Sequence, residues 1–171
     1  MRKLATLLIG VLLLGFALPA FAEHKDGRFR ATLTSFEEVP TLSTPGRGEF
    51  LAQIEPDDSA IHYVLSYSGL AGTVSVAHIH LGRRATVGGV IAFLCGGGGK
   101  PACPPSGTVQ GTIRASDVVG PTEQGIQPGE FAELLRAMRV RATYANVHTD
   151  LFPAGEIRGQ IRFDWRAFFE K

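Results

Sequence analysis

The sequence predicts an all-β fold, an antiparallel β-sandwich with one short helix. Short stretches of alternating apolar and polar residues recur along the chain, separated by turns rich in glycine, proline and aspartate. A single segment, residues 128–138, instead has apolar residues at helical spacing. No internal repeat divides the chain, so residues 23–171 are expected to form one domain, with its core at 28–163.

Eight segments show the alternation expected of half-buried strands. They are residues 28–35, 48–55, 60–68, 73–81, 88–95, 107–114, 139–149 and 155–163. The sequence Pro56-Asp57-Asp58-Ser59 is typical of a turn, so the second and third strands are predicted to form a hairpin. Pro128 suits the first turn of the helix. The apolar face of the helix is Phe131, Leu134, Leu135 and Met138.

Residues 1–22 are typical of a cleavable export signal. Arg2 and Lys3 precede the apolar run from Leu4 to Phe16, and Ala20-Phe21-Ala22 fits the small-x-small cleavage pattern. The apolar run is shorter than the roughly 20 residues that a membrane span needs, and no second long run follows. We therefore expect a protein exported to the periplasm or the extracellular space, with no membrane span after cleavage.

The charge balance argues against a nucleic-acid partner. The full chain has 17 basic and 16 acidic residues, and loss of Arg2 and Lys3 with the leader brings the formal charge to −1. No block of basic residues creates a strong positive field. Gly96–Lys100 differs from a phosphate-binding loop at both ends, and no Gly-x-Ser-x-Gly elbow occurs. We assign no catalytic residue.

Two cysteines, Cys95 and Cys103, are predicted to form a disulfide, because export places them in an oxidising compartment. The loop between them is short, so the chain-entropy contribution is only about 2–3 kcal/mol. The alternative is a pair of thiolate metal ligands.

The segment at residues 73–81 is the most informative of the predicted strands. Because side chains alternate along a strand, four of its residues are predicted to share one face. They are Val74, Val76, His78 and His80. Two apolar residues followed by two histidines indicate a strand that leaves the core and presents imidazoles at its end.

A second segment, residues 144–149, places His148 on one face with Tyr144 and Asn146. We hypothesise that His78, His80 and His148 meet in one metal site. Imidazole-rich sites suit copper, zinc, nickel or iron, of which copper and zinc are the expected ions, and an open coordination position would allow catalysis. The carboxylates of Glu37, Glu38 and Glu156 are additional candidate ligands or ligand partners.

The alternative is that these histidines are structural and bond backbone carbonyls at a sheet edge. His62 lies on a separate strand and is expected to be a solvated strand residue. Arg158 is expected to form a salt bridge with a neighbouring strand, and Glu156 either joins it or lies beside the histidines.

Several motifs resemble those of the CHRD domain, a module named from chordin. They are Phe29-Arg30-Ala31-Thr32-Leu33, Glu37-Glu38-Val39-Pro40, Tyr67-Ser68-Gly69-Leu70, Ala77-His78-Ile79-His80-Leu81-Gly82, Tyr144-Ala145-Asn146-Val147-His148-Thr149 and Gly155-Glu156-Ile157-Arg158-Gly159-Gln160-Ile161. The resemblance covers roughly residues 28–163 and implies an immunoglobulin-like β-sandwich, of a kind that bacterial members typically export. It implies no settled activity.

The chain is also similar, more weakly, to copper–zinc superoxide dismutase, a β-sandwich with a His-x-His strand. That family needs more histidines than the five of this chain provide, since His24 and His62 lie apart from the others. Dismutase activity is therefore not expected.

Two hypotheses of function follow. The first is an exported, non-enzymatic interaction module for a protein or glycan ligand, using its loops or the aromatic tail with Trp165, Phe168 and Phe169. The second is a metal-dependent enzyme or metal-binding protein built on His78, His80 and His148. We rank the binding module first and regard metal binding as a property that it can carry.

Overall fold

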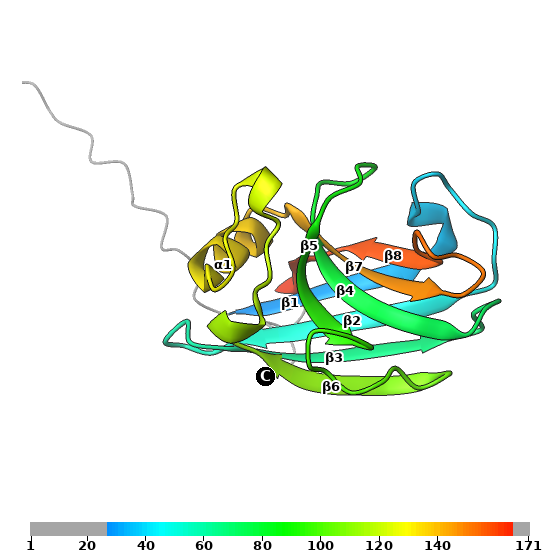
Figure 1. Cartoon of the computed structure of the whole chain (residues 1–171), viewed down its shortest axis with the longest axis horizontal. Coiled ribbons are helices and arrows are strands. Elements are labelled where there is room, and N and C mark those ends of the chain that lie inside the picture. The colour runs from blue at the N-terminus through cyan, green and yellow to red at the C-terminus, as the bar shows by residue number, and fades with distance from the viewer. Residues whose placement is uncertain (1–26, 166–171) are drawn as a thin grey trace, which may run out of the picture.

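Nine antiparallel strands build the fold in residues 27–165, the part of the chain that the computed structural model describes (Figure 1). The strands are β1 (Arg28–Thr34), β2 (Arg47–Ile54), β3 (Ile61–Ser68), β4 (Val74–Leu81), β5 (Val90–Cys95), β6 (Gly107–Ile113), β7 (Thr143–Thr149), β8 (Ile157–Gln160) and β9 (Arg162–Phe163). One α-helix, α1 (Phe131–Arg139), lies within the same range. The predicted all-β antiparallel class with one helix is confirmed. The predicted leader, residues 1–22, and Phe168 and Phe169 lie outside the described residues.

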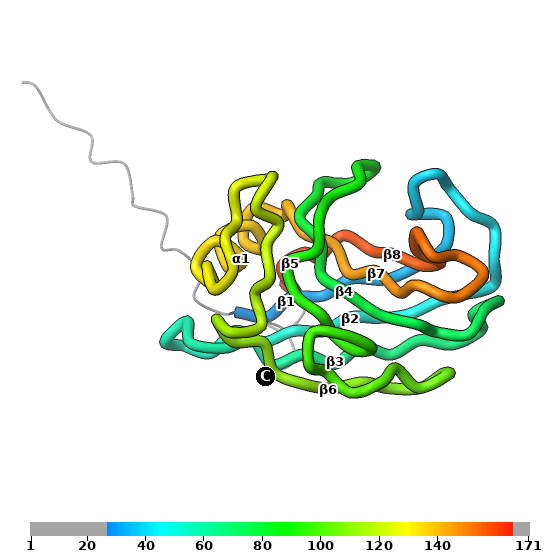
Figure 2. The backbone as a smooth tube through the Cα atoms, viewed as in Figure 1, coloured from blue at the N-terminus to red at the C-terminus, as the bar shows by residue number. Residues whose placement is uncertain are grey.

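The strands form one continuous sheet in the order β5-β4-β7-β8-β1-β2-β3-β6, with β9 paired to β1 (Figure 2). The sheet curls until its end strands, β5 and β6, approach each other, so it resembles a nearly closed barrel. The sequence predicts a two-sheet sandwich instead. The difference arises at β8, which pairs with β7 and also, through Arg158 and Thr34, with β1. This strand joins what would otherwise be two separate sheets.

The gap between β5 and β6 is held closed by side chains. The Tyr63 hydroxyl donates a hydrogen bond to the Leu94 carbonyl oxygen at 2.7 Å, which ties β3 to β5 across the barrel. The predicted disulfide between Cys95 and Cys103 is present, with Cα atoms 5.0 Å apart. The Lys100 ammonium, within the loop that the disulfide closes, donates to the Thr112 carbonyl oxygen of β6 at 2.8 Å.

The inner face of the curled sheet holds the apolar core. Phe50 on β2, its partner Leu65 on β3 and Ile79 on β4 are fully buried there. Burial of each such side chain contributes about 1.5–3 kcal/mol relative to exposure. Helix α1 closes one end of the barrel (Figure 1), with its predicted apolar face buried. It begins at Phe131 rather than at 128, because Gly129 has a positive φ of 87° and turns the chain first.

The side-chain alternation of β4 changes phase within the strand. Val74 pairs with Thr149 and Val76 with His148, so Ser75 is an extra residue that forms a β-bulge. As a result Val74 joins the core, as do Ala77 and Ile79, whereas Val76 does not. The prediction that Val74 shares a face with His78 and His80 is therefore wrong. The two histidines lie on the outer face of the sheet, in the second half of β4.

Two other strand predictions differ at their ends. The segment 139–149 begins as a strand only at Thr143, because α1 extends to Arg139 and Arg141 has a positive φ of 58°. The segment 155–163 divides into β8 and β9. Among residues 27–165, no helix has the length and apolar character required to cross a bilayer.

Candidate metal centre

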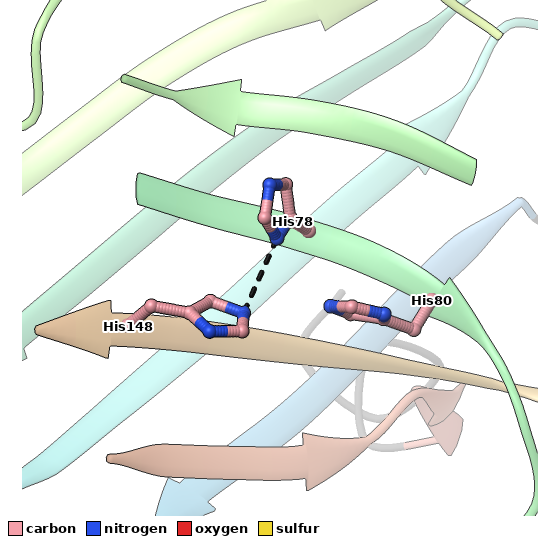
Figure 3. Close-up of side chains that lie close together, drawn as sticks. All are labelled: His78, His80 and His148. Atoms are coloured by element: carbon pink, nitrogen blue, oxygen red, sulfur yellow. Dashed lines mark hydrogen bonds between the residues drawn. The ribbon is translucent and has the colours of Figure 1, made fainter. Parts of the chain in front are cut away.

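His78, His80 and His148 meet on the outer face of β4 and β7, as hypothesised from the sequence (Figure 3). One ring nitrogen from each residue lies within 4.8 Å of the other two. Although they lie outside the barrel, the three residues are only 7%, 7% and 8% exposed. The site is therefore a second, small interior that is separate from the apolar core.

Two of the rings have a fixed proton position. The Nδ1 of His80 lies 2.9 Å from the Gly88 carbonyl oxygen, and the Nδ1 of His148 lies 3.0 Å from the Pro153 carbonyl oxygen. Because a carbonyl oxygen only accepts hydrogen bonds, each Nδ1 carries the proton and each Nε2 presents a lone pair. The His80 Nε2 is buried and has no hydrogen-bond partner. This is the arrangement that orients histidine ligands in metal proteins.

His78 completes the group through its Nδ1, which lies 3.2 Å from the Nε2 of His148 (Figure 3). Since that Nε2 presents a lone pair, the His78 Nδ1 donates a proton to it in the metal-free molecule. Metal binding through Nδ1 requires that this proton move to Nε2 of the same ring. The change is one of tautomer, not of charge.

The electrostatics keep all three rings neutral. Burial lowers the pKa of His78 to about 3, with the nearby His148 and His80 adding to the effect. Burial also lowers the pKa of His80 to about 4 and lowers the pKa of His148. Neutral imidazole is the form that binds a metal, so protons do not compete for the lone pairs near neutral pH.

Glycine is required at position 88, where the backbone supplies the acceptor for His80. A Cβ atom there would lie 1.6 Å from the carbonyl oxygen of Leu81, at the end of β4. The Gly88 amide also donates to the Tyr144 hydroxyl at 3.2 Å. The Tyr144 ring in turn stacks on the His80 ring, with centroids 4.8 Å apart and planes 3° from parallel. The loop between β4 and β5 is thus held over the site.

An aromatic wall closes the site beside His78. The ring of Phe93 on β5 meets the His78 ring edge-to-face with centroids 4.6 Å apart. Backbone of Gly97 and Gly98 lies so close over Phe93 that a Cβ atom at either position would come within 2.6 Å of its ring. The glycine-rich loop, which the disulfide closes, is therefore a packing element over this wall.

A polar network borders the other side. Asn146, on the same face of β7 as His148, donates to the Glu38 carboxyl at 2.6 Å and to the Ile157 carbonyl oxygen at 2.9 Å. Burial raises the pKa of Glu38 to about 7, although Asn146 and Arg158 oppose the rise. The Arg158 guanidinium lies 3.8 Å from the centre of the Tyr144 ring and donates to the Thr86 carbonyl oxygen.

The three glutamates named from the sequence have other partners, and the group of candidate ligand atoms within 4.8 Å consists of the three histidines. Glu37 forms an ion pair with Arg84. Glu38 bonds Asn146. Glu156 is fully buried and accepts from the backbone amides of Ala71 and Gly72 and from the Thr149 hydroxyl, so it ties the loop before β4 to β7.

His62 lies apart from the site, on the outer face of β3. It bonds Glu55 at 2.5 Å and Thr112 at 3.1 Å and is exposed, in line with the prediction of a solvated strand residue. It lines a groove of about 610 Å³ on β1, β2, β3 and β6, in which Leu51 and Val64 are 40% and 38% exposed.

Sequence reasoning missed the groups that orient the rings. The carbonyl groups of Gly88 and Pro153 and the ring of Phe93 carry no motif of their own. The Gly88-Gly89 pair is the one available signal, because adjacent glycines permit a close backbone approach.

The CHRD domain family matches the chain over residues 29–161, which span β1 to β8 and all three histidines. The chain belongs to the CHRD family. No curated protein and no solved structure matches it. The family match identifies the domain. The chemistry of its histidine site is inferred from the arrangement of the side chains.

The arrangement of this CHRD domain can hold one transition-metal ion with only small movements. Three nitrogen ligands at about 2.0–2.1 Å from one ion, in trigonal or tetrahedral arrangement, lie about 3.3–3.6 Å apart, so the widest pair has to close by at most about 1.5 Å. The 3.2 Å between His78 and His148 is already close to that separation.

Proposed function

We propose that this chain is exported and that its CHRD domain binds a copper or zinc ion through His78, His80 and His148. The observation that carries the proposal is the buried Nε2 of His80, which faces the other two rings and has no hydrogen-bond partner. A buried polar atom without a partner is costly, and a metal bond would satisfy it.

A purely structural histidine cluster accounts for less of the geometry. A structural role explains the Nδ1 bonds to Gly88 and Pro153, but it leaves the lone pair of His80 unused. A metal ligand requires both features, namely a second nitrogen held by a carbonyl group and a free lone pair.

Metal analysis of the mature protein tests the proposal. The protein is purified from its export compartment without chelators and compared with a His78→Ala/His80→Ala variant. About one copper or zinc per chain, absent from the variant, is the expected result. A metal-free protein that takes up neither ion on titration would overturn the proposal. The rings would then be structural.

Export is part of the same proposal. The N-terminal 22 residues have the pattern of a cleavable signal, and the disulfide suits an oxidising compartment, either periplasmic or extracellular. Mass spectrometry of the mature protein is expected to find an N-terminus at Glu23. An intact leader would contradict this.

A second candidate function is an interaction module for a protein or glycan ligand. The groove on β1, β2, β3 and β6 favours it, because Leu51 and Val64 stand exposed among polar side chains. On a panel of glycans, any glycan that binds the wild-type protein is expected not to bind the Val64→Lys variant. Equal retention by both proteins would exclude the groove as the contact.

A further inference from the structure

We propose that the three-histidine centre is selective for monovalent copper over divalent zinc. The inference rests on the proposed function, metal binding by the same rings, and adds the identity and oxidation state of the ion. Four properties of the site support it, namely the charge of the donors, their burial, the surrounding groups and the number of donors.

The donors bring no negative charge. Imidazole binds a metal ion in its neutral form, and the group of ligand atoms consists of three histidines and includes no carboxylate. Thiolates are excluded, because Cys95 and Cys103 form the disulfide and the described chain has no free cysteine. A bound ion therefore keeps its whole charge.

Burial makes that charge expensive. The three residues are 7–8% exposed, so a bound ion has little contact with water. In continuum electrostatics the cost of transferring an ion from water rises with the square of its charge. At similar radius, a divalent ion therefore costs about four times as much as a monovalent ion.

The surroundings do not compensate a second positive charge. Phe93 and Tyr144 supply aromatic rings against His78 and His80. The charged neighbours are the Arg158 guanidinium and the Glu38 carboxyl, and burial raises the pKa of Glu38 to about 7, so the carboxyl offsets the guanidinium only in part. The surroundings therefore carry no excess negative charge before the ion enters.

The number of donors points the same way. Copper(I) carries a single charge and accepts three nitrogen ligands without a further donor. Structural zinc sites are almost always four-coordinate. The three rings supply three nitrogens, so zinc would have to take a fourth donor, such as hydroxide, from outside the protein.

A competition experiment tests the inference. Metal-free mature protein is exposed without oxygen to equal concentrations of copper(I) and zinc(II), each in excess, then desalted and analysed. The expected result is about one copper per chain and less than about one tenth as much zinc. The copper is expected to be lost in His80→Ala and retained in His62→Ala, a matched change on the open face.

Oxidation state is read from the same sample by electron paramagnetic resonance after exposure to air. Copper(I) gives no signal, and the buried neutral site is expected to keep the spectrum silent. A signal of copper(II) equal to the copper content would overturn the inference.

The outcomes separate the two proposals. Zinc at more than about one tenth of the copper content, lost in His80→Ala, would overturn the selectivity and leave the metal site standing. Binding of neither ion by the wild type would overturn the proposed function together with the inference.

Discussion

The outer surface of one sheet carries histidines in two opposite settings. On β4 and β7 three histidines lie under loops and are 7–8% exposed, and one ring nitrogen has no partner. On β3 the exposed His62 has partners at both nitrogens, Glu55 and Thr112. In both settings the histidines lie on the outer face of paired antiparallel strands, so the covering loops make the difference in exposure. A candidate ligand site in this fold is a face from which the loops exclude water.

The largest expected effect is on metal affinity. Its absence would contradict the distinction between the covered histidines and His62. His80→Ala removes the ring whose lone pair is free, whereas His62→Ala removes a ring on the open face. We expect the first to lower the affinity for copper by at least about a hundredfold and the second to leave it unchanged. Competition with a chromophoric chelator measures both. Equal losses would show that the covered face has no special role.

The second effect concerns the loops themselves. Gly155 has a positive φ of 127°, and a Cβ atom there would lie 2.6 Å from the Asn146 amide oxygen and 2.8 Å from the Glu38 carboxyl. Gly125 also has a positive φ, 93°, but has open space around it. We expect Gly155→Ala to lower the free energy of unfolding by about 1–3 kcal/mol more than Gly125→Ala.

Urea denaturation of both glycine variants gives the difference. Similar losses of unfolding free energy in the two variants would mean that backbone strain alone causes the destabilisation. The polar network beside the histidines would then accommodate a methyl group without a further loss.

The third effect is the pH dependence of stability in the metal-free protein. Burial lowers the pKa of His80 from its ordinary 6.5 to about 4 in the fold. Below pH 6.5 the unfolded chain therefore binds more protons than the folded chain. The contribution of the neutral His80 ring to the free energy of unfolding is therefore complete above pH 6.5 and is lost as the pH drops towards 4.

We expect His80→Gln to reduce this fall by an amount on the order of 1–3 kcal/mol, measured by urea denaturation between pH 7 and pH 4. An unchanged slope would show that the His80 ring is hydrated rather than buried.

The smallest expected effect is the contribution of Glu38 to stability, and its dependence on pH is opposite in sign to that of His80. Burial raises the pKa of Glu38 from 4.5 to about 7, so the folded state favours the neutral acid. Its contribution is complete below pH 4.5 and is lost as the pH rises through 7. Glu38→Gln is expected to raise stability at pH 8 by about 1 kcal/mol relative to the wild type. Glu49→Gln, on the half-buried side chain that pairs with Arg30 on the other face, is the control, and equal changes would contradict the prediction.

Sequence patterns predicted much of the fold, because alternation reports which residues face a core. They predicted strands close to β1 through β6, the disulfide and the helix. They did not distinguish one curled sheet from two, since β8 alternates in the same way whether it has one neighbour or two. They also missed the phase change at Ser75, because a bulge depends on the partner strand.

The candidate site was predictable in its side chains and not in its environment. His78, His80 and His148 stand out as polar residues within apolar strands, and the structure brings them together. The groups that orient them are the backbone carbonyls of Gly88 and Pro153, which any residue type supplies. The three glutamates look equally suitable in the sequence, but tertiary contacts engage them elsewhere.

The extra residue in β4 also determines which changes of chain length the domain can accept. Deletion of Ser75 would restore simple alternation from Val74 onward. With Val74 kept in its inner position, Ala77 and Ile79 would stay in the core and the two imidazoles would stay on the outer face. Among descendants of this sequence, loss of the codon for Ser75 would therefore straighten the strand and leave the three histidines together.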